Sequence, residues 1–358
     1  MTRIMNGLSL FAGAGIAELN LESCGINVLL ANELIASRCK MHECWNKNAE
    51  VICGDITDTK IKDTVINKAI SKEIDFILAT PPCQGVSLIG KNKTNDEMLN
   101  DQRNFLIFHA FEIIDKIDPK VVVIENVARF LSMKFPYDNE MMRISDIISI
   151  RYGHKYKIDV SVYNSADYGV PQSRQRAIIV MCKDGFSYVK PKKQKHITVR
   201  DAIYDLPSLE AGQDSSIKNH KARNHSEKHI LWMKHTPTGK SATENDIFYP
   251  QKENGEKLKC YSASYKRIDW DKPAPTITMR NDAISSQSNV HPGRLQPDGT
   301  YSDARVLTLR ELFILSSINP DIDVPNDVSD IQIRHMIGEA VPPRLMEAIC
   351  KNIIREDI

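Results

Sequence analysis

The sequence predicts an α/β fold with a mixed, mostly parallel sheet, plus a small, irregular, β-rich second domain. Three observations predict this. Short apolar runs recur along the first half of the chain, as in buried parallel strands. Helical patterns separate these runs, as in βαβ units. After Cys182 the chain becomes basic, histidine-rich and weakly periodic, which marks a second domain.

The composition favours a globular protein in a reducing, cytoplasmic compartment. The chain has 358 residues, 42% of them hydrophobic, which suits one large domain and a smaller one. With a formal net charge of +1, a polyanion would have to bind at a local patch. The eight cysteines include no C-x-x-C pair, so we expect neither a metal site nor a disulfide framework. No apolar run has the length of a signal peptide or a membrane span.

The chain opens like a nucleotide-binding domain. An expected strand over Ile4–Phe11 leads into the turn Phe11-Ala12-Gly13-Ala14-Gly15-Ile16, and a helical pattern that ends at Gly25 follows. Glycines allow the backbone to approach a ligand closely at a helix N-terminus. A plain tight turn explains the glycines alone equally well, so this motif needs support from elsewhere.

Acids at the next two strand ends supply that support. Glu33 follows the expected strand Asn27–Ala31 and lies 20 residues after Gly13, a spacing suited to accepting from ribose hydroxyls. The alternative for Glu33 is a helix N-terminal acid. Asp55, after a further short strand, is placed to accept from an adenine amine. No Walker lysine motif occurs, so the pattern predicts S-adenosylmethionine rather than a dinucleotide.

A cysteine directly follows the fourth expected strand. The buried run Phe76–Ala79 is stopped by Pro81 and Pro82, and Cys83 comes next. The carboxyl ends of parallel strands are where ligands bind in open α/β sheets. A lone cysteine is more often a small buried hydrophobe. This setting, with a glycine-rich and therefore mobile loop after it, favours a nucleophile.

A carboxylate and two arginines complete the candidate centre. Glu125 follows the buried run Val121–Ile124, where partial burial would raise its pKa and keep it protonated near neutrality. A helix cap or a solvated acid is the alternative. Arg174 and Arg176 alternate, so we expect both on one strand face, where they need anionic or carbonyl partners. A solvated sheet edge is the competing interpretation.

Further elements are expected on either side of the basic stretch. The sequence predicts strands over Tyr156–Val162 and Ala177–Cys182, and a turn followed by a strand over Pro273–Arg280. Thr308 and Glu311 form a capping box that starts a helix. A last helix is expected to run to about Ile354.

The motifs together resemble those of the C5-cytosine DNA methyltransferases. They occur in the family's order: Phe-Ala-Gly-x-Gly, Pro-Pro-Cys-Gln-Gly-x-Ser, Glu-Asn-Val, Gln-x-Arg-x-Arg, Arg-x-Leu-Thr-x-Arg-Glu and Gly-x-Ala-Val-Pro-Pro. Only the stretch from about Lys183 to Ser262 lacks them, and it matches the family's variable target-recognition region in place and size. The resemblance implies a Rossmann-like class I methyltransferase fold. It implies a catalytic domain over 1–184, a target-recognition domain over 185–324 (variable part about 185–262), and a returning segment over 325–358.

The resemblance also implies an activity. Such an enzyme transfers a methyl group from S-adenosylmethionine to C5 of a cytosine flipped out of a specific double-stranded DNA sequence, through a covalent adduct between Cys83 and C6. It implies a bacterial, cytoplasmic, monomeric protein, with a cognate restriction endonuclease as a possible partner. Two alternatives stay open.

The first alternative is a tRNA cytosine-C5 methyltransferase, because that branch of the family also has Pro-Pro-Cys-Gln, although its Cys-Phe-Thr tripeptide is absent here. The second alternative is a non-catalytic DNA-binding regulator on the same scaffold.

Residue roles follow by position. Cys83 is similar to the nucleophile, Glu125 to the acid at cytosine N3, and Arg174 and Arg176 to the pair that lines the base pocket, with Arg176 nearer to O2. Residues expected at the cofactor are Phe11, Ala12, Gly13, Gly15, Ile16, Glu33, Asp55, Ile56, Pro82, Leu106, Glu339, Ala340 and Val341. Residues expected at DNA are Gln84, Ser87, Lys91, Arg103, Thr276 and Arg280.

Two positions depart from the family's pattern. Ile16 replaces the second glycine of a Gly-Gly pair, and Glu339 replaces the asparagine of Gly-Asn-Ala-Val-Pro. Glu339 puts a carboxylate where the family uses an amide near the cofactor. This bears on cofactor affinity and not on the methyl transfer.

Overall fold

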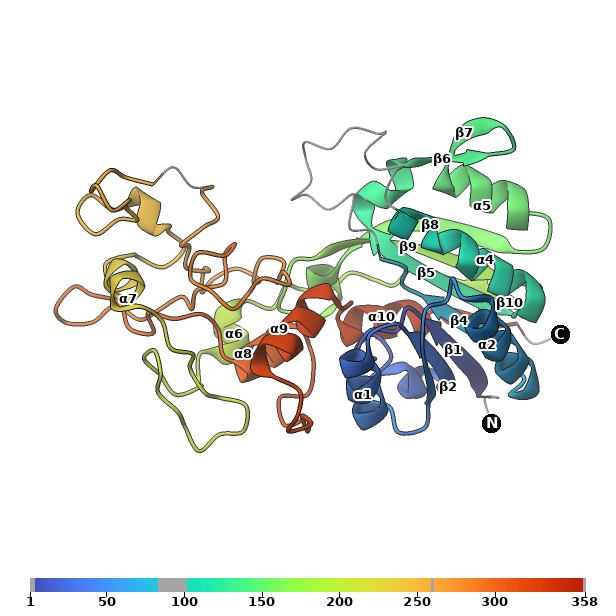
Figure 1. Ribbon diagram of the computed structural model, residues 1–358, viewed down its shortest axis with the longest axis horizontal. Coiled ribbons are helices and arrows are strands. Elements are labelled where there is room, and N and C mark those ends of the chain that lie inside the picture. Colours follow the sequence, from blue (N-terminus) through green and yellow to red (C-terminus); the bar gives the residue numbers. More distant parts are fainter. Residues whose placement is uncertain (1–3, 83–101, 259–260, 357–358) are drawn as a thin grey trace. The chain divides into compact units, whose positions relative to one another are not determined.

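A computed structural model describes residues 4–82, 102–258 and 261–356 (Figure 1). Cys83, Gln84, Ser87 and Lys91 lie outside the described residues. The chain divides into two compact units, each described here by itself. Unit 1 comprises Met1–Asn164, Gln175–Lys193 and Pro343–Ile358, and unit 2 comprises Ser165–Arg174 and Gln194–Pro342.

Unit 1 is built on a seven-stranded sheet in the order β3-β2-β1-β4-β5-β9-β8. The first five strands are parallel, whereas β9 runs antiparallel to both β5 and β8. From the β1–β4 pair, the strand order proceeds in opposite directions towards the two edges of the sheet. In open α/β sheets, ligands bind at the carboxyl ends of the strands at such a point. The strands are β1 (Met5–Leu10), β2 (Ile26–Glu33), β3 (Glu50–Cys53), β4 (Phe76–Ala79), β5 (Val121–Val127), β8 (Lys157–Asn164) and β9 (Gln175–Cys182). The prediction of a Rossmann-like, mostly parallel sheet is confirmed.

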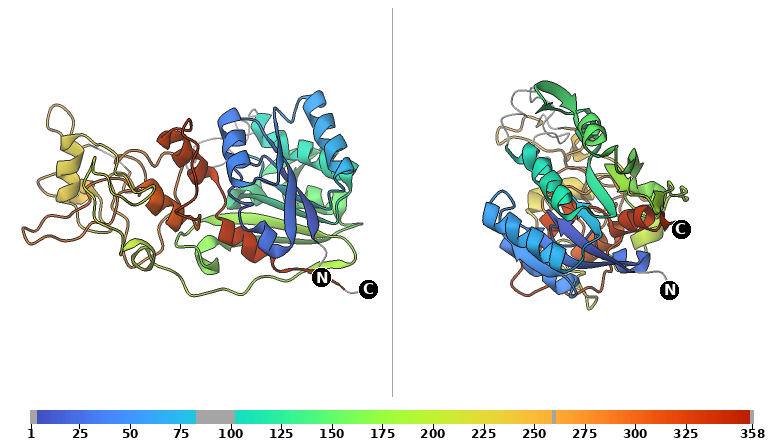
Figure 2. Two further views of the ribbon diagram at one scale, coloured as in Figure 1. Left: turned by 90° about the horizontal axis from the view of Figure 1, so that it is seen from below. Right: turned by 90° about the vertical axis from the view of Figure 1, so that its right-hand side faces the viewer.

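Helices pack on both faces of this sheet. α2, α4 and α5 share one apolar core with the strands, while α10 contacts η1, and Figure 2 shows α10 across the sheet from α2 and α4. The helical elements of unit 1 are η1 (Leu21–Cys24), α1 (Ala36–Trp45), α2 (Thr59–Ser71), η3 (Gln102–Phe105), α4 (Leu106–Ile117), η4 (Ala128–Ser132), α5 (Ile144–Tyr152) and α10 (Pro343–Cys350). The hairpin of β6 (Lys134–Tyr137) and β7 (Glu140–Arg143) forms a small sheet, and β10 (Phe186–Tyr188) pairs with β11 (Ile353–Arg355) in another two-stranded sheet.

The core explains why the central strands form where they do. All four residues of β4 are fully buried, and so are Val121–Val123 of β5. Uninterrupted apolar runs are what a strand covered on both faces requires. On α4, the apolar side chains recur three and four residues apart and bury Ala110, Phe111 and Ile114 against this core.

Unit 2 is largely irregular. Its helical elements are η5 (Ser165–Tyr168), α6 (Val199–Ile203), α7 (Glu227–Lys234), η6 (Ala242–Glu244), α8 (Leu309–Leu315) and α9 (Asp330–Glu339). Among its described residues, β pairing consists of isolated bridges such as Gln172 with Ala274. The expected capping box is present, because Thr308 accepts from the Glu311 amide and Glu311 accepts from the Thr308 amide. No helix in the described ranges is long and apolar enough to cross a membrane.

Several expected elements differ in the structure. The helical pattern before Gly25 forms turns and the short helix η1 in place of a longer helix. Gly25 takes a left-handed conformation, which ends η1. The expected strand after Pro275 does not form, and Ala274 alone makes a bridge. The last helix ends at Cys350, where the chain turns into β11 and pairs with β10.

The unit boundaries also differ from the expected ones. The first boundary lies at Lys193 and Gln194 rather than at 184 and 185, and the second lies at Pro342 and Pro343 rather than at 324 and 325. Ser165–Arg174 belongs to unit 2, because Gln172 bonds to the Ser316 hydroxyl there. The functional division of the chain stays a prediction.

Candidate active site

Glu125 and Arg176 form a buried ion pair at the end of β5. Arg176 Nε lies 2.8 Å from Glu125 Oε1, and Glu125 is 7% exposed. In the antiparallel register Val127 faces Arg176 and Glu125 faces Ile178. Glu125 and Arg176 are therefore diagonal neighbours on one face of the sheet, within reach of long side chains. The expectation that these two groups lie together is met within unit 1.

Burial of the pair affects the pKa of Arg176. Burial lowers the pKa of Arg176, and the charge and hydrogen bond of Glu125 oppose that shift. The expectation that burial keeps Glu125 protonated near neutrality stays a prediction.

Asn126 connects the segment after β4, which contains the Pro81-Pro82 pair, to the strand that carries Glu125. Its Nδ2 donates to the carbonyl oxygen of Pro81 at 3.0 Å, and the side chain is 4% exposed. Ala79 and Ile124 are register partners in the parallel β4–β5 pair. The residue that precedes Pro82, the covalent neighbour of Cys83, is thus fixed against the Glu125 strand. Cys83 itself lies outside the described residues.

Arg174 does not share the strand face of Arg176. It precedes β9 and belongs to unit 2, where its guanidinium donates to the carbonyl oxygens of Ile277, Gly338 and Glu339 at 2.9, 2.9 and 2.8 Å. The two-residue alternation required both arginines to be in β9, but β9 begins at Gln175. Arg174 has the carbonyl partners that we expected, and they come from the segment that ends at Glu339.

Glu33 holds the glycine turn at its Gly13 end. Its Oε2 accepts from the Gly13 amide and its Oε1 from the Ile35 amide, both at 2.9 Å. Phe11 and Gly13 both have a φ of 57°, and Gly15 has a φ of 73°. The turn therefore uses left-handed backbone. A Cβ on Gly13 would meet nothing within 4 Å, which leaves room beside the turn for a ligand.

The other residues expected at the cofactor lie near strand ends of the same unit. Asp55 follows β3, is exposed, and accepts from the Thr57 amide at 2.9 Å. Ile56 is buried, and Leu106 begins α4, half-buried against the core. Acidic groups at two strand ends beside an open glycine turn fit an adenosine-bearing cofactor.

Comparison with known proteins decides the family. A model described as C-5 cytosine-specific DNA methylase matches residues 5–355. This chain belongs to that family. It is accordingly an enzyme, a DNA (cytosine-5-)-methyltransferase.

Relatives support this assignment, and a solved structure shares the fold. The chain is 47% identical over 357 residues to the Type II methyltransferase M1.HgaI of Avibacterium volantium, with 100% of both chains covered. It is 30% identical to the Type II methyltransferase M1.HphI of Haemophilus parahaemolyticus, over 97% of this chain and 86% of the relative. The Entamoeba histolytica methyltransferase EhMeth shares the fold, with a TM-score of 0.63, 16% identity and 97% of each chain covered.

The methyltransferase's second unit holds several of the other residues expected at the cofactor or at DNA. Val341 is buried, and Gly338 lies so close to Thr278 that a Cβ would overlap its carbonyl oxygen. Thr276, expected at DNA, uses its hydroxyl to donate to the Ser173 carbonyl at 2.8 Å. Arg280 is exposed, 3.6 Å from Asp282. In unit 1, Arg103 is exposed on η3.

Unit 2 of the methyltransferase also has a buried ionic network that the sequence did not predict. Arg305 pairs with Glu311 at 2.8 Å and with Asp303 at 2.9 Å, and all three are almost completely buried. Burial raises the pKa of Glu311, but the charges of Arg305 and His291 outweigh it and bring that pKa to about 2. The capping box was the only sequence signal at this place. The network fixes the start of α8.

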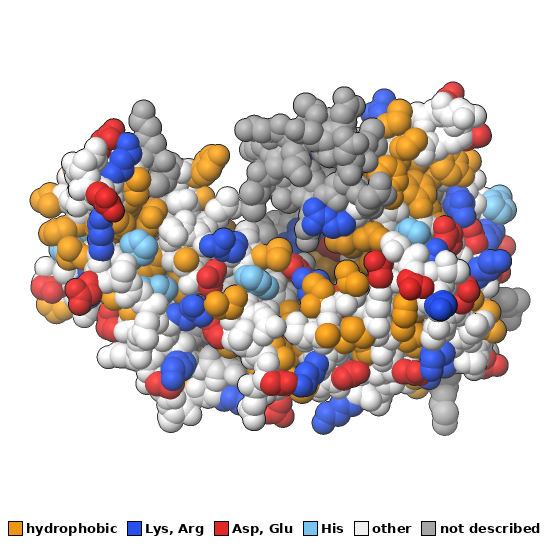
Figure 3. Space-filling view, viewed as in Figure 1, with side chains coloured by type: hydrophobic (Ala, Val, Ile, Leu, Met, Phe, Trp, Pro, Cys, Tyr) orange, Lys and Arg blue, Asp and Glu red, His pale blue; other side chains and the backbone are white. Residues whose placement is uncertain are grey.

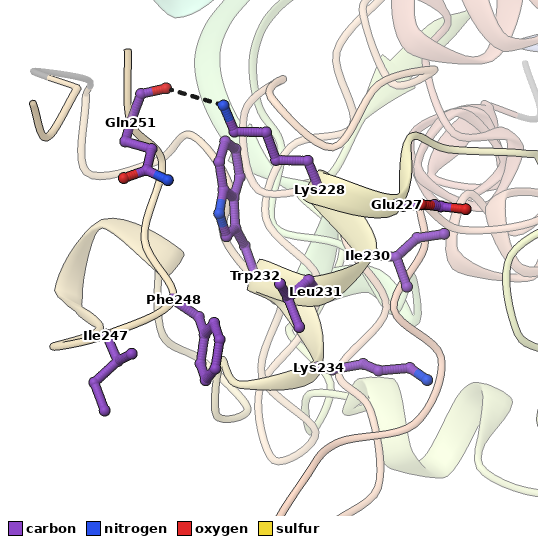
Figure 4. Close-up of a pocket in the computed structure, with 9 residues that line it drawn as sticks. All are labelled: Glu227, Lys228, Ile230, Leu231, Trp232, Lys234, Ile247, Phe248 and Gln251. Carbon is purple, nitrogen blue, oxygen red and sulfur yellow. Dashed lines mark hydrogen bonds between the residues drawn. The ribbon is translucent and has the colours of Figure 1, made fainter. Parts of the chain in front are cut away.

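A groove in unit 2 contains none of the residues expected at cytosine or cofactor. It has a volume of about 800 Å³ and lies along α7, where Trp232, Phe248 and Lys228 line it (Figure 4). Lys228 Nζ lies 5.3 Å from the centre of the Trp232 ring and donates to the Gln251 carbonyl at 3.5 Å. On the face in Figure 3, basic and acidic side chains are interspersed.

Two buried polar side chains near the predicted site residues were missed. Asn126 belongs to the Glu-Asn-Val motif, but only the structure shows that its side chain donates a hydrogen bond to the Pro81 carbonyl. Glu18, two residues after the glycine turn, is 4% exposed and bonds to Ser9. A carboxylate in an otherwise apolar segment was its sequence signal.

Proposed function

We propose that this methyltransferase moves a methyl group from S-adenosylmethionine to C5 of a cytosine flipped out of double-stranded DNA, through a covalent bond between Cys83 Sγ and cytosine C6. The observation that carries the proposal is the Glu125–Arg176 pair, with Asn126 fixing the chain just before Pro82. A nucleophile, an acid and a cation at neighbouring strand ends are the groups that addition to a pyrimidine ring requires.

The residues have separate tasks in this reaction. The Cys83 thiolate adds to C6, and the electron pair of the C5–C6 bond shifts so that C5 becomes nucleophilic. Glu125 supplies a hydrogen bond or proton at N3 and so neutralises the charge that addition creates. Arg176 holds the Glu125 carboxyl group in place. The bound cofactor supplies an electrophilic methyl group. Loss of the C5 proton, for which water is the candidate acceptor, then restores the double bond and releases Cys83.

The described residues fit the cofactor, although its contacts stay a proposal. Glu33 is placed to accept from ribose hydroxyls in exchange for its present bond to the Gly13 amide. Asp55 is placed to accept from the adenine amine. Ala340 and Val341, with Glu339 before them, are proposed to complete the cofactor site, as in the family.

A trapping experiment tests the covalent step. A duplex pool containing 5-fluorocytosine is incubated with the protein and cofactor, because fluorine at C5 cannot leave as a cation and the adduct persists. We expect a protein–DNA species that survives denaturation in wild type and in Cys53→Ser, a control at an exposed cysteine. Cys83→Ser should give none. A trapped species in Cys83→Ser, or methylation of tRNA and not of DNA, would contradict the proposal.

We also propose that the enzyme is the modification half of a bacterial restriction–modification system. The support is its 47% full-length identity to a Type II methyltransferase. The variable part, about 185–262, would read the sequence through base edges, with phosphate contacts from basic residues. Bisulfite sequencing of DNA from a host that expresses the protein should show 5-methylcytosine in one short recurring sequence. Methylation without sequence preference would argue against this role.

A further inference from the structure

Unit 1 contains a buried polar group beneath the glycine turn, formed by Ser9, Glu18 and His42, here called the Ser9–Glu18–His42 cluster. Their exposed fractions are 0%, 4% and 0%. The Ser9 hydroxyl on β1 donates to Glu18 Oε1, and His42 Nε2 on α1 lies 3.9 Å from the same oxygen. Carboxylates and imidazoles are seldom buried completely, because burial of a polar group is costly. The cluster therefore calls for a reason other than packing.

The charge states within the cluster are unusual. Burial raises the pKa of Glu18 to about 7, against an opposing hydrogen bond from Ser9, and nearby Glu33 on β2 adds to the increase. Burial lowers the pKa of His42 to about 4, so its ring is neutral at pH 7. The contact between the two is accordingly not a full ion pair at neutral pH. Glu18 is instead held by its hydrogen bond from Ser9, and the neutral His42 ring packs against it 3.9 Å away without a hydrogen bond.

The same helix that carries His42 fixes the end of the glycine turn. Gly15 has a φ of 73°, and a Cβ there would overlap Asn46 Nδ2 and lie 2.7 Å from His42 Cδ2. Asn46 Nδ2 also donates to the Gly15 carbonyl at 3.0 Å. His42 and Asn46 are four residues apart and so lie on one face of α1 and its continuation. They contact Gly15, while Glu33 binds the amide at Gly13.

We propose that Glu18 is a positioning residue for the cofactor: with Ser9 it sets the His42 ring, and His42 with Asn46 sets the Gly15 end of the turn. The inference rests on the proposed function, because it assumes that S-adenosylmethionine binds at this turn. Glu18 takes no part in proton transfer to the base. Its effect reaches the cofactor only through the shape of the backbone from Gly13 to Gly15.

Calorimetric binding to the full-length protein tests this with two ligands, S-adenosylmethionine and S-adenosylhomocysteine, whose sulfur is uncharged. Glu18→Ala should weaken both about tenfold, as expected for one lost bond to a buried group. The KM for the cofactor should rise equally, with kcat at saturation within about twofold of wild type. Glu18→Gln keeps an acceptor for Ser9 and should restore affinity to within about threefold. Glu22→Gln, at an exposed acid nearby, is the matched control and should bind normally.

Several outcomes would overturn the inference. One is an unchanged Kd in a folded Glu18→Ala protein, and another is a lower kcat at an unchanged Kd. Weaker binding of the sulfonium alone would show attraction by charge and not positioning. If Glu18→Ala does not fold, Asn46→Ala decides at a half-buried site: both ligands should bind several-fold more weakly, and unchanged binding would refute the inference. A wild-type protein that binds neither ligand would overturn the proposed function, and the inference with it.

Discussion

Asn126 donates its side-chain amide to the Pro81 carbonyl at 3.0 Å, and this bond joins two sequence motifs that lie far apart in the chain. The first motif ends β4 with Pro81 and Pro82, and the second places Glu125 and Asn126 in β5. Because the bond is buried, it fixes the backbone from which the Cys83 segment leaves the sheet. The nucleophile and the acid of the proposed reaction are thereby attached to neighbouring strands.

Loss of that bond should affect turnover more than cofactor binding. Asn126→Ala removes the donor and leaves the Pro81 carbonyl unsatisfied, which should cost about 1–3 kcal/mol of stability. We expect kcat to fall at least about tenfold, while the Kd for the cofactor, which we propose to be bound mainly by Glu33 and the glycine turn, stays within about twofold. Steady-state kinetics and calorimetry on one preparation compare the two. A weaker Kd with an unchanged kcat would contradict the assigned task.

The Glu125–Arg176 pair predicts a large effect from a small change. Glu125→Gln retains the shape but cannot supply a carboxylic proton at N3, so we expect kcat to fall about 10²- to 10³-fold. Arg176→Met should lose stability by about 3–5 kcal/mol, because it removes the ion-pair partner of the buried Glu125 side chain. Glu112→Gln, at an exposed acid on α4, is the control. Activity near wild type in Glu125→Gln would remove Glu125 from the chemistry.

Glu18 predicts a pH dependence of stability. Its pKa in the folded protein is about 7 against an ordinary 4.5, so the folded state binds the proton more tightly. The contribution of Glu18 to stability is therefore complete below about pH 4.5 and is lost as pH rises through 7. Relative to Glu18→Gln, wild type should lose up to about 3 kcal/mol between pH 5 and 8. Chemical denaturation at several pH values measures the difference, and a constant difference would contradict the raised pKa.

Gly15 should tolerate no side chain. Gly15→Ala meets both a φ of 73° and the His42 and Asn46 side chains, so we expect a loss of cofactor affinity beyond tenfold. Gly25→Ala has the same φ of 73° but would meet nothing within 4 Å. It should cost only the backbone strain of about 1–2 kcal/mol and leave the Kd unchanged. Equal Kd values for both variants would show that the contacts at Gly15 are unimportant.

The ionic network of unit 2 predicts sensitivity to acid. The pKa of Glu311 in the folded protein is about 2, below its ordinary 4.5, so its contribution to stability is present above pH 4.5 and lost as pH falls towards 2. Glu311→Gln should flatten this part of the acid denaturation curve and cost about 3–5 kcal/mol at pH 7, since Arg305 stays buried. Tryptophan fluorescence suits the measurement, because Trp232 and Trp270 lie in unit 2. Identical curves for variant and wild type would contradict the network's role.

Much of unit 1 was predictable because its signals are local. The apolar runs at Phe76–Ala79 and Val121–Ile124 predict buried strands, and the structure places both inside the sheet. Glu33 was expected to accept from ribose hydroxyls, which stays a prediction, and the structure shows its carboxylate accepting from the Gly13 amide. The prediction that Arg174 shares the strand face of Arg176 was wrong, because it relied on alternation along the chain. Alternation along the chain assumes a continuous strand, and the strand starts one residue too late for Arg174 to join it.

The sequence by itself determined the family, the order of the motifs and the parallel sheet, because these depend on residue type and on spacing along the chain. Only the tertiary structure decided that Arg176 pairs with Glu125, that Asn126 holds Pro81, and that Glu18 lies buried next to His42. These contacts join residues from different strands and helices. Their geometry depends on sheet register and on helix packing, neither of which a local pattern encodes.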